Sequence, residues 1–189
     1  MVPWELLKQN KLNAYKKAFD AGLVDEKAIP LINEVNSKPN YVTTSSCSGR
    51  IMLLKFNKGK KDSSFYHKWH RTVDFNEVWK AIQDYDKSEK LWFRAEPFIF
   101  HIYAKDLESA QKFLEITRKS GIKRGGIFYF KEYPFLEIFG TEGISVPVVD
   151  QNEILIDEKY GRYVVESSNI LLNRIFKRLD IFTENVSKL

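Results

Sequence analysis

The first forty residues show the hydrophobic spacing of two helices. Apolar residues recur at helical intervals from Trp4 to Ala21, and Gly22 then provides a stop. Residues 24–38 continue with a second helical pattern, which Asp25 caps and Pro30 kinks or restarts. We therefore expect two N-terminal helices within about residues 4–39.

Beyond residue 40, short segments rich in β-branched and aromatic residues predict strands. They cover residues 41–46, 51–56, 65–72, 91–94, 97–103, 126–131, 134–139, 144–149 and 153–157. Helical patterns separate some of them, at residues 74–85, 106–119 and 158–184. Strand pairs alternate with helices, but without the strict rhythm of a doubly wound parallel sheet. The pattern therefore predicts an α+β fold with a mixed or largely antiparallel sheet flanked by helices, and not a Rossmann-type fold.

Charge and composition add a modest bias toward a polyanionic partner. The chain has 189 residues, of which 30 are basic and 25 acidic, and its net charge is +5. A basic balance favours nonspecific attraction to polyanions, and exposed aromatic residues would suit base stacking. The apolar runs are too short to span a bilayer, and the start of the chain lacks the apolar core of a signal peptide. One cysteine and three histidines exclude an intramolecular disulfide and a Cys-rich zinc site, so we expect a cytoplasmic setting without membrane or metal.

The run TTSSCSGR at residues 43–50 holds the only cysteine of the chain among hydroxyl side chains. As a nucleophile, Cys47 would need a lowered pKa and a base such as His70, yet its spacing to Arg50 matches no phosphatase-type loop. The serines and Gly49 could instead expose backbone N–H groups that bind an anion or a carboxylate together with Arg50. A turn whose hydroxyls cap its own backbone is equally consistent with these residue types.

Two histidines stand out in different contexts. His70 lies in the segment KWHRTVD and could act near neutral pH as a base or an orienting group, or it could be a structural histidine. Strand alternation puts His101 on the face opposite Phe98, Phe100 and Ile102, and these three make the better core face.

One carboxylate and one basic segment complete the candidate chemistry. Glu96 precedes Pro97 at the entry to a strand, where it could bind an amine or simply face solvent. Residues 118–127, RKSGIKRGGI, predict either a plain basic loop after a helix or a loop whose glycines let phosphates approach the backbone. The basic residues of such a phosphate footprint are Lys58, Lys60, Lys61, Lys123 and Arg124.

The order of these motifs resembles a known family. The segments SSCSGRIMLL, KWH, RAEPFIFHIYAKDLESAQKFLEITRKSGIKRGGI, GTEGISVPV and EKYGRYVVESSN follow one another over about residues 41–169. In this order they are similar to the tRNA wybutosine-synthesizing protein 3 family. The resemblance implies one methyltransferase domain over residues 1–189, with the N-terminal helices packed on it. It also implies S-adenosyl-L-methionine as the cofactor, and methylation of N-4 of a tricyclic wyosine precursor at guanosine 37 of tRNA(Phe), with the anticodon region as partner.

The resemblance also suggests site residues at the matching positions. For catalysis they are His70, Arg50 and Ser46. For the cofactor they are Ser45, Ser48, Gly49, Glu96 and His101. Gly126 joins the RNA footprint. Where the family commonly has Asn-Ser-Gly, this chain has Arg124-Gly125-Gly126, so only the backbone role of the glycine carries over.

Two other classes of function remain open at this point. A non-catalytic RNA-binding protein would bind tRNA without a pocket for the methyl donor. A Cys-dependent hydrolase would lose its activity when Cys47 is replaced by Ser, whereas a methyltransferase, which needs no covalent enzyme intermediate, would tolerate the change.

Overall fold

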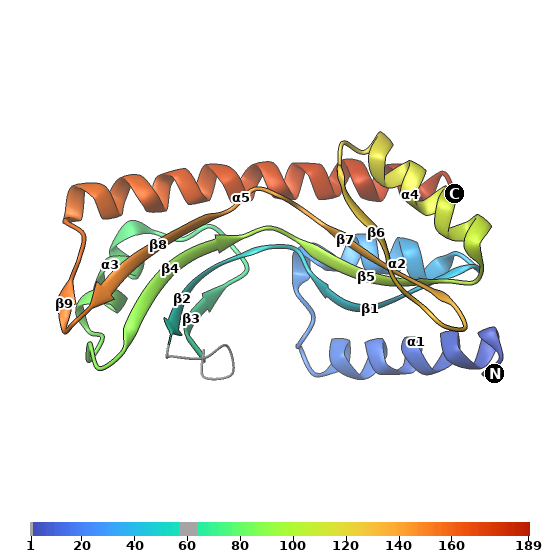
Figure 1. Ribbon diagram of the computed structural model, residues 1–189, viewed down its shortest axis with the longest axis horizontal. Coiled ribbons are helices and arrows are strands. Elements are labelled where there is room, and N and C mark those ends of the chain that lie inside the picture. The colour runs from blue at the N-terminus through green and yellow to red at the C-terminus, as the bar shows by residue number, and fades with distance from the viewer. Residues whose placement is uncertain (1, 57–63) are drawn as a thin grey trace. The chain divides into compact units, whose positions relative to one another are not determined.

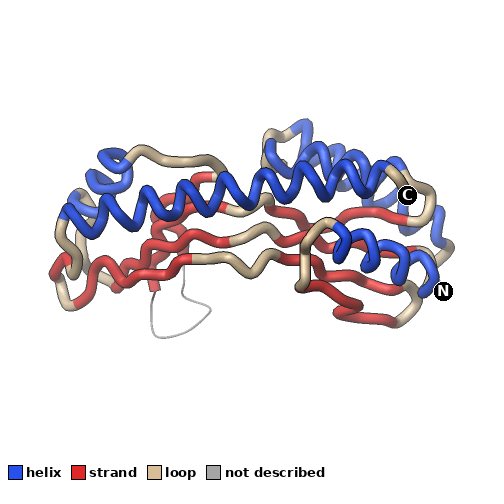
Figure 2. Tube along the Cα trace, turned by 90° about the horizontal axis from the view of Figure 1, so that it is seen from above, coloured by secondary structure: helices blue, strands red, loops and turns tan. Residues whose placement is uncertain are grey.

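The computed structural model describes residues 2–56 and 64–189, which form two compact units interleaved along the chain (Figures 1 and 2). The first unit comprises residues 1–48, 98–141 and 175–189, and the second comprises residues 49–97 and 142–174. Each unit contains one β-sheet. Whether the two units act as the single domain expected from the sequence stays a prediction.

The first unit holds a four-stranded antiparallel sheet with the order β1-β5-β7-β6. Its strands are β1 (Tyr41–Cys47), β5 (Ile99–Ala104), β7 (Pro134–Phe139) and β6 (Arg124–Phe130). Its helices are α1 (Trp4–Asp20), η1 (Glu26–Ala28), α2 (Ile29–Ser37), α4 (Leu107–Lys119) and the part of α5 (Glu158–Ser187) that begins at Ile175. α1 and α2 pack against β1, and α4 packs against β5, β6 and β7.

Strand alternation builds the core of the first unit. Phe100 and Ile102 of β5 are fully buried, whereas the residues on either side of each are only half-buried. Their cross-strand partners on β7, Ile138 and Leu136, are buried on the same face. The predicted core face of this strand is therefore confirmed, because a period of two sends alternate side chains to opposite faces.

The second unit holds a five-stranded antiparallel sheet with the order β3-β2-β4-β8-β9. Its strands are β2 (Arg50–Phe56), β3 (Ser64–Trp69), β4 (Lys90–Glu96), β8 (Ile144–Asp150) and β9 (Glu153–Ile154). The helix α3 (Phe75–Gln83) and the first part of α5 supply apolar side chains that line one small interior space with Phe93 of β4. The predicted α+β fold is confirmed, since every strand pair between described residues is antiparallel and none forms a parallel Rossmann-type sheet.

Side-chain caps set several of the boundaries that the sequence predicts. The carboxylates of Asp25, Asp74 and Asp106 accept hydrogen bonds from backbone N–H groups of η1, α3 and α4 respectively. Pro30 lies in the first turn of α2, so it restarts a helix after η1, as its missing N–H allows. The strand predicted at 153–157 is wrong beyond Ile154, because Asp157 instead accepts a hydrogen bond from the backbone N–H of Tyr160 at the start of α5.

The basic segment after α4 also differs from expectation. The loop predicted over residues 118–127 is short, since β6 already begins at Arg124. The chain reverses at Gly121, whose φ of +76° favours glycine, and Ile122 is buried. Arg124 and Gly126 therefore lie in a strand at the edge of the first sheet. Among the described residues, no helix is long and apolar enough to cross a membrane.

Candidate functional site

The hydroxyl-rich run forms β1 and contains a β-bulge. Thr43 pairs with Ile102, but Ser46 pairs with Phe100, so the chain advances by three residues on β1 and by two on β5. A bulge of this kind redirects the side chains next to it. As a result, Ser45 is exposed although it lies within a strand, and Ser46 is half-buried.

A cavity of about 350 Å³ lies beside this bulge in the first unit. Ser45 and Ser46 line one side of it. Its other walls come from α1, from α2 and from the segment that joins α1 to η1, through Lys11, Ala14, Tyr15, Ala18, Leu23, Val24 and Ile32. The cavity thus combines hydroxyl groups, one lysine and an apolar wall, a combination typical of small-molecule pockets.

The hydroxyl of Ser46 has an unusual environment. Its Oγ is buried and has no hydrogen-bond partner among the described residues. Folded proteins rarely leave a buried hydroxyl unpaired, because its desolvation is not compensated. By contrast, Tyr15 donates its hydroxyl to Oδ1 of Asn33 at 2.8 Å, and burial raises the pKa of this phenol.

Ser48 makes its hydrogen bonds within the first unit. Its backbone N–H and its hydroxyl both donate to Oδ2 of Asp25, at 2.7 and 2.5 Å. Both donors are therefore already bound to a carboxylate of the protein itself. The sequence did not indicate that Asp25 is the partner of Ser48. Gly49 follows with a φ of +104°, a conformation that favours glycine.

Arg50 and Glu96 form an ion pair in the second unit. They lie directly opposite each other on β2 and β4. Nε and Nη2 of Arg50 both donate to Oε2 of Glu96, at 3.0 and 2.8 Å, while Nη2 of Arg94 lies 3.2 Å from Oε1. The Arg50 guanidinium also lies 4.8 Å from the ring centroid of Phe65. Two guanidinium groups therefore share one carboxylate, so these three side chains together carry a net positive charge.

His70 lies at the same end of the second sheet. β2 and β3 pair Ile51 with Trp69, so Arg50 and His70 each stand one residue beyond that pair. Trp69 donates its indole N–H to Glu77 at 2.8 Å, which anchors the end of β3 to α3. Hydrogen bonds from Arg71, and also the one from Trp69, hold the pKa of Glu77 below its usual range.

His101 and Gly126 lie on the half-buried face of the first sheet. Nε2 of His101 lies 2.9 Å from Oε2 of Glu137, its cross-strand partner, and Gly126 pairs with the same Glu137 from the other side. A Cβ at Gly126 would meet no atom within 4 Å, whereas one at Gly125 would lie 2.7 Å from Cδ1 of Ile138. A Cβ at Gly125 would thus crowd Ile138, whereas Gly126 leaves open space beside the hydrogen-bonded pair of His101 and Glu137.

The structure brings together two groups of the site residues expected from the sequence. Ser45 and Ser46 line one cavity of the first unit, and Arg50, Glu96 and His70 lie at one end of the second sheet, where Arg50 and Glu96 form an ion pair. Lys123 and Arg124 are exposed before and at the start of β6. Three further residues of the expected RNA footprint, Lys58, Lys60 and Lys61, lie outside the described residues.

Two functional candidates escaped the sequence. Arg94 contacts Glu96, and its position two residues earlier on the same strand face is a signal that could have found it. The contact of Asp25 with Ser48 joins positions 23 residues apart, and no local pattern points to it.

Comparisons with known proteins give a consistent result over almost the whole chain. The family model described as methyltransferase TYW3 matches residues 4–188. The chain is 34% identical over 189 residues to tRNA(Phe) 7-((3-amino-3-carboxypropyl)-4-demethylwyosine(37)-N(4))-methyltransferase 1 of Pyrococcus abyssi, covering 98% of this chain and 97% of the relative. A relative from Methanocaldococcus jannaschii with the same activity in its name is 33% identical and covers 88% of each chain.

Solved structures agree with this match. A protein from Pyrococcus horikoshii superposes with a TM-score of 0.91 at 34% identity, covering 97% of this chain and 95% of that one. A hypothetical protein from Aeropyrum pernix superposes with a TM-score of 0.75 at 24% identity, covering 87% of this chain and 98% of that one, which shows a shared fold.

Proposed function

Since the chain belongs to the methyltransferase TYW3 family, we propose that it methylates N4 of 7-(3-amino-3-carboxypropyl)-4-demethylwyosine at position 37 of tRNA(Phe), with S-adenosyl-L-methionine as the methyl donor. The observation that carries this proposal is the near full-length similarity to relatives whose names all state this reaction. The protein acts on the anticodon region of the tRNA, where position 37 lies, and a cytoplasmic location stays a prediction.

The cavity beside β1 has the chemistry that this cofactor requires. Lys11 and the hydroxyls of Ser45 and Ser46 suit a carboxylate and a ribose, and the aromatic and apolar wall with Tyr15 suits an adenine ring. The unpaired Oγ of Ser46 then gains a hydrogen-bond partner on binding. Ser48 contributes indirectly, because Asp25 holds it and thereby fixes the end of β1.

The reaction is a displacement at a methyl carbon. The bound cofactor supplies a methyl group on a sulfonium sulfur, and in the transfer the N4–C bond forms, the S–C bond breaks and N4 loses its proton. Most of the rate gain comes from holding donor and acceptor in line. His70 accepts or orients the N4 proton, since a ring nitrogen of a histidine can take up a proton in the transition state.

Arg50 positions a charged group of the ligands. Its guanidinium is held by Glu96 and shares that carboxylate with Arg94, so positive charge remains for a second carboxylate. The amino-carboxypropyl group of the acceptor carries such a carboxylate. Gly49 and His101 complete the cofactor and acceptor contacts in this proposal, and Lys123, Arg124 and Gly126 contact phosphates of the tRNA.

The cofactor assignment has a binding test. Isothermal titration with S-adenosyl-L-methionine should show binding to the wild-type protein, and Ser46→Ala should weaken it about three- to tenfold, as expected for one lost hydrogen bond. Ser64→Ala removes an exposed hydroxyl of the other unit and serves as control. If the wild-type protein fails to bind the cofactor both with and without tRNA, a non-catalytic RNA-binding protein becomes the better explanation.

The role of His70 is tested by separating turnover from binding. His70→Ala should lower single-turnover methyl transfer by about 10²- to 10⁴-fold, the usual contribution of a general base, while the Kd for tRNA changes little. His67→Ala, an exposed histidine of β3, is the matched control. Equal losses of turnover and tRNA affinity would remove His70 from the chemistry. Cys47→Ser should retain activity, and its loss would favour a Cys-dependent hydrolase.

A further inference from the structure

One face of the second sheet carries alternating charged and aromatic side chains along its central strand. Lys90, Trp92 and Arg94 are at least partly exposed on β4, while Leu91 and Phe93 between them are buried. The side chains of Lys90 and Arg94 are 56% and 38% exposed. Two of these side chains, Lys90 and Trp92, line a cavity. None of the residues assigned to methyl transfer above lines it.

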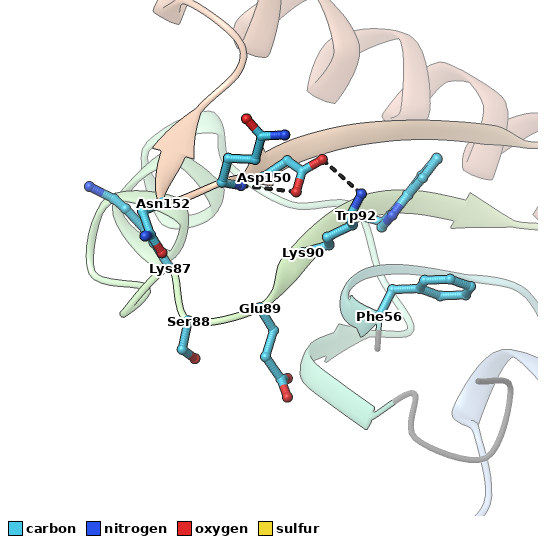
Figure 3. A pocket seen from close by; sticks show the side chains of 9 residues that line it. Phe56, Lys87, Ser88, Glu89, Lys90, Trp92, Asp150 and Asn152 are labelled. Atoms are coloured by element: carbon cyan, nitrogen blue, oxygen red, sulfur yellow. Dashed lines mark hydrogen bonds and ion pairs between the residues drawn. The ribbon is translucent and has the colours of Figure 1, made fainter. Parts of the chain in front are cut away.

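This cavity has a volume of about 370 Å³ and lies entirely within the second unit (Figure 3). Its lining comes from the end of β2, from the turn between α3 and β4, from the start of β4 and from the turn between β8 and β9. The lining residues are Phe56, Lys87, Ser88, Glu89, Lys90, Trp92, Asp150, Gln151 and Asn152. In Figure 3 the rings of Phe56 and Trp92 lie on one side of Lys90, and Lys87, Asp150 and Asn152 lie on the other.

The aromatic side of the cavity offers ring surface and one unused donor. Phe56 is 43% exposed, which is unusual for a phenylalanine in a strand of a packed sheet. Its ring centroid lies 6.4 Å from that of Trp92, in a tilted arrangement. The indole N–H of Trp92 is buried and has no hydrogen-bond partner in the described part of the chain.

The polar side of the cavity offers cations and amides on two fixed turns. Gln151 and Asn152 have φ angles of +50° and +64°, so they form a two-residue hairpin turn between β8 and β9. Lys90 pairs with Asp150 at 2.8 Å, which ties this turn to β4. Lys87, also in the left-handed region with φ +59°, makes no ion pair with any described residue.

Ring surface, amide groups and an unpaired cation in one cavity match three features of a nucleotide, namely the face of its base, the polar edge of that base and its phosphate. A base stacks on an aromatic ring, amide groups bond to its polar edge, and a lysine contacts the phosphate. We propose that this cavity holds one nucleotide of the tRNA, with its base on Phe56 and Trp92 and its phosphate at Lys87. The proposal rests on the proposed function, because it takes tRNA(Phe) as the substrate, and it adds a docking site for a nucleotide other than the methylated one.

The experiment measures the Kd of tRNA(Phe) by fluorescence anisotropy at several salt concentrations. Phe56→Ala should weaken binding about five- to a hundredfold, the range expected for one lost base–aromatic stack. Lys87→Asn, which keeps a residue that tolerates positive φ, should lower the slope of log K against log salt by about 0.7 to 0.9. Circular dichroism confirms that each variant is folded.

Matched controls remove an exposed aromatic ring and an exposed lysine elsewhere in the second unit. Tyr163→Ala deletes an exposed ring of α5, and Lys80→Gln deletes an exposed lysine of α3. Both should bind tRNA like the wild-type protein. A Kd within twofold of wild type for both Phe56→Ala and Lys87→Asn would overturn the proposal.

A second arm separates RNA from a free nucleotide. Adenosine monophosphate is titrated against the wild-type protein and Phe56→Ala. If Phe56→Ala weakens mononucleotide binding but leaves tRNA binding intact, the cavity serves a free nucleotide and the RNA assignment is wrong. Methyl transfer by the wild-type protein is measured first, so that a missing activity counts against the proposed function and normal activity with unaffected variants counts against the cavity alone.

Discussion

Replacing Asp25 with Ala should destabilise the protein far more than a surface substitution does. The Asp25 carboxylate accepts two hydrogen bonds from Ser48, at 2.7 and 2.5 Å, and one from the backbone N–H of Lys27 at 3.3 Å. Ser48 is fully buried, so both of its donors depend on this one carboxylate.

The magnitude follows from the groups left behind. Each buried donor that loses its partner costs about 1–3 kcal/mol, and losing the N-cap of η1 adds about 0.5–1 kcal/mol. Part of this cost is offset where water reaches the half-buried position 25. We therefore expect the free energy of unfolding to fall by about 3–5 kcal/mol for Asp25→Ala, and by about 1 kcal/mol for Ser48→Ala, which removes only the hydroxyl.

The assay is urea unfolding followed by circular dichroism, with the midpoint compared between variants. Asp20→Ala, which removes an exposed carboxylate at the end of α1, is the control and should stay within about 0.5 kcal/mol of wild type. The double variant Asp25→Ala/Ser48→Ala should lose less than the sum of the single variants, because both remove the same hydrogen bond. A loss below 1 kcal/mol for Asp25→Ala, or strict additivity, would refute this reasoning.

Two further predictions concern packing and pH. Gly125→Ala should lower the free energy of unfolding by about 1–3 kcal/mol, since its Cβ would lie 2.7 Å from Cδ1 of Ile138. Gly126→Ala should change that free energy by less than about 0.5 kcal/mol. Equal effects of the two substitutions would show that the strand relaxes around both. Because hydrogen bonds from Arg71 lower the pKa of Glu77, that carboxylate stabilises the fold above its unfolded pKa, and the stabilisation is lost as pH falls through the lower folded pKa. The difference in Tm between wild type and Glu77→Gln should therefore be present at pH 7 and vanish in strong acid, and a difference that grows on acidification would contradict this sign.

The fold class could be predicted from the sequence because its signals are local. Alternation on β5, the caps at Asp74 and Asp106, and the stop at Gly121 each depend on neighbours in the chain. The sequence could not show that the strands divide into two sheets, because strand partners such as β4 and β8 lie some fifty residues apart.

The sequence named residues for the candidate site, but it could not predict how they contact one another. Arg50 and Glu96 were both expected, but their ion pair follows from the register of β2 and β4, which no local pattern gives. The bulge in β1 was not predictable either, since serine and threonine tolerate both a regular strand and an irregular one. It is this bulge that places Ser45 and Ser46 at a cavity.

The most direct test of the proposed function is methyl transfer to a defined tRNA. Purified protein is incubated with S-adenosyl-L-methionine and tRNA(Phe) that carries 7-(3-amino-3-carboxypropyl)-4-demethylwyosine at position 37, and the nucleosides are analysed by mass spectrometry. The control is the same tRNA with an unmodified guanosine at position 37. We predict that one methyl group appears on N4 of the modified base and none on the control. Methylation of the unmodified tRNA, or no methylation of the demethylwyosine nucleoside, would contradict the proposed function.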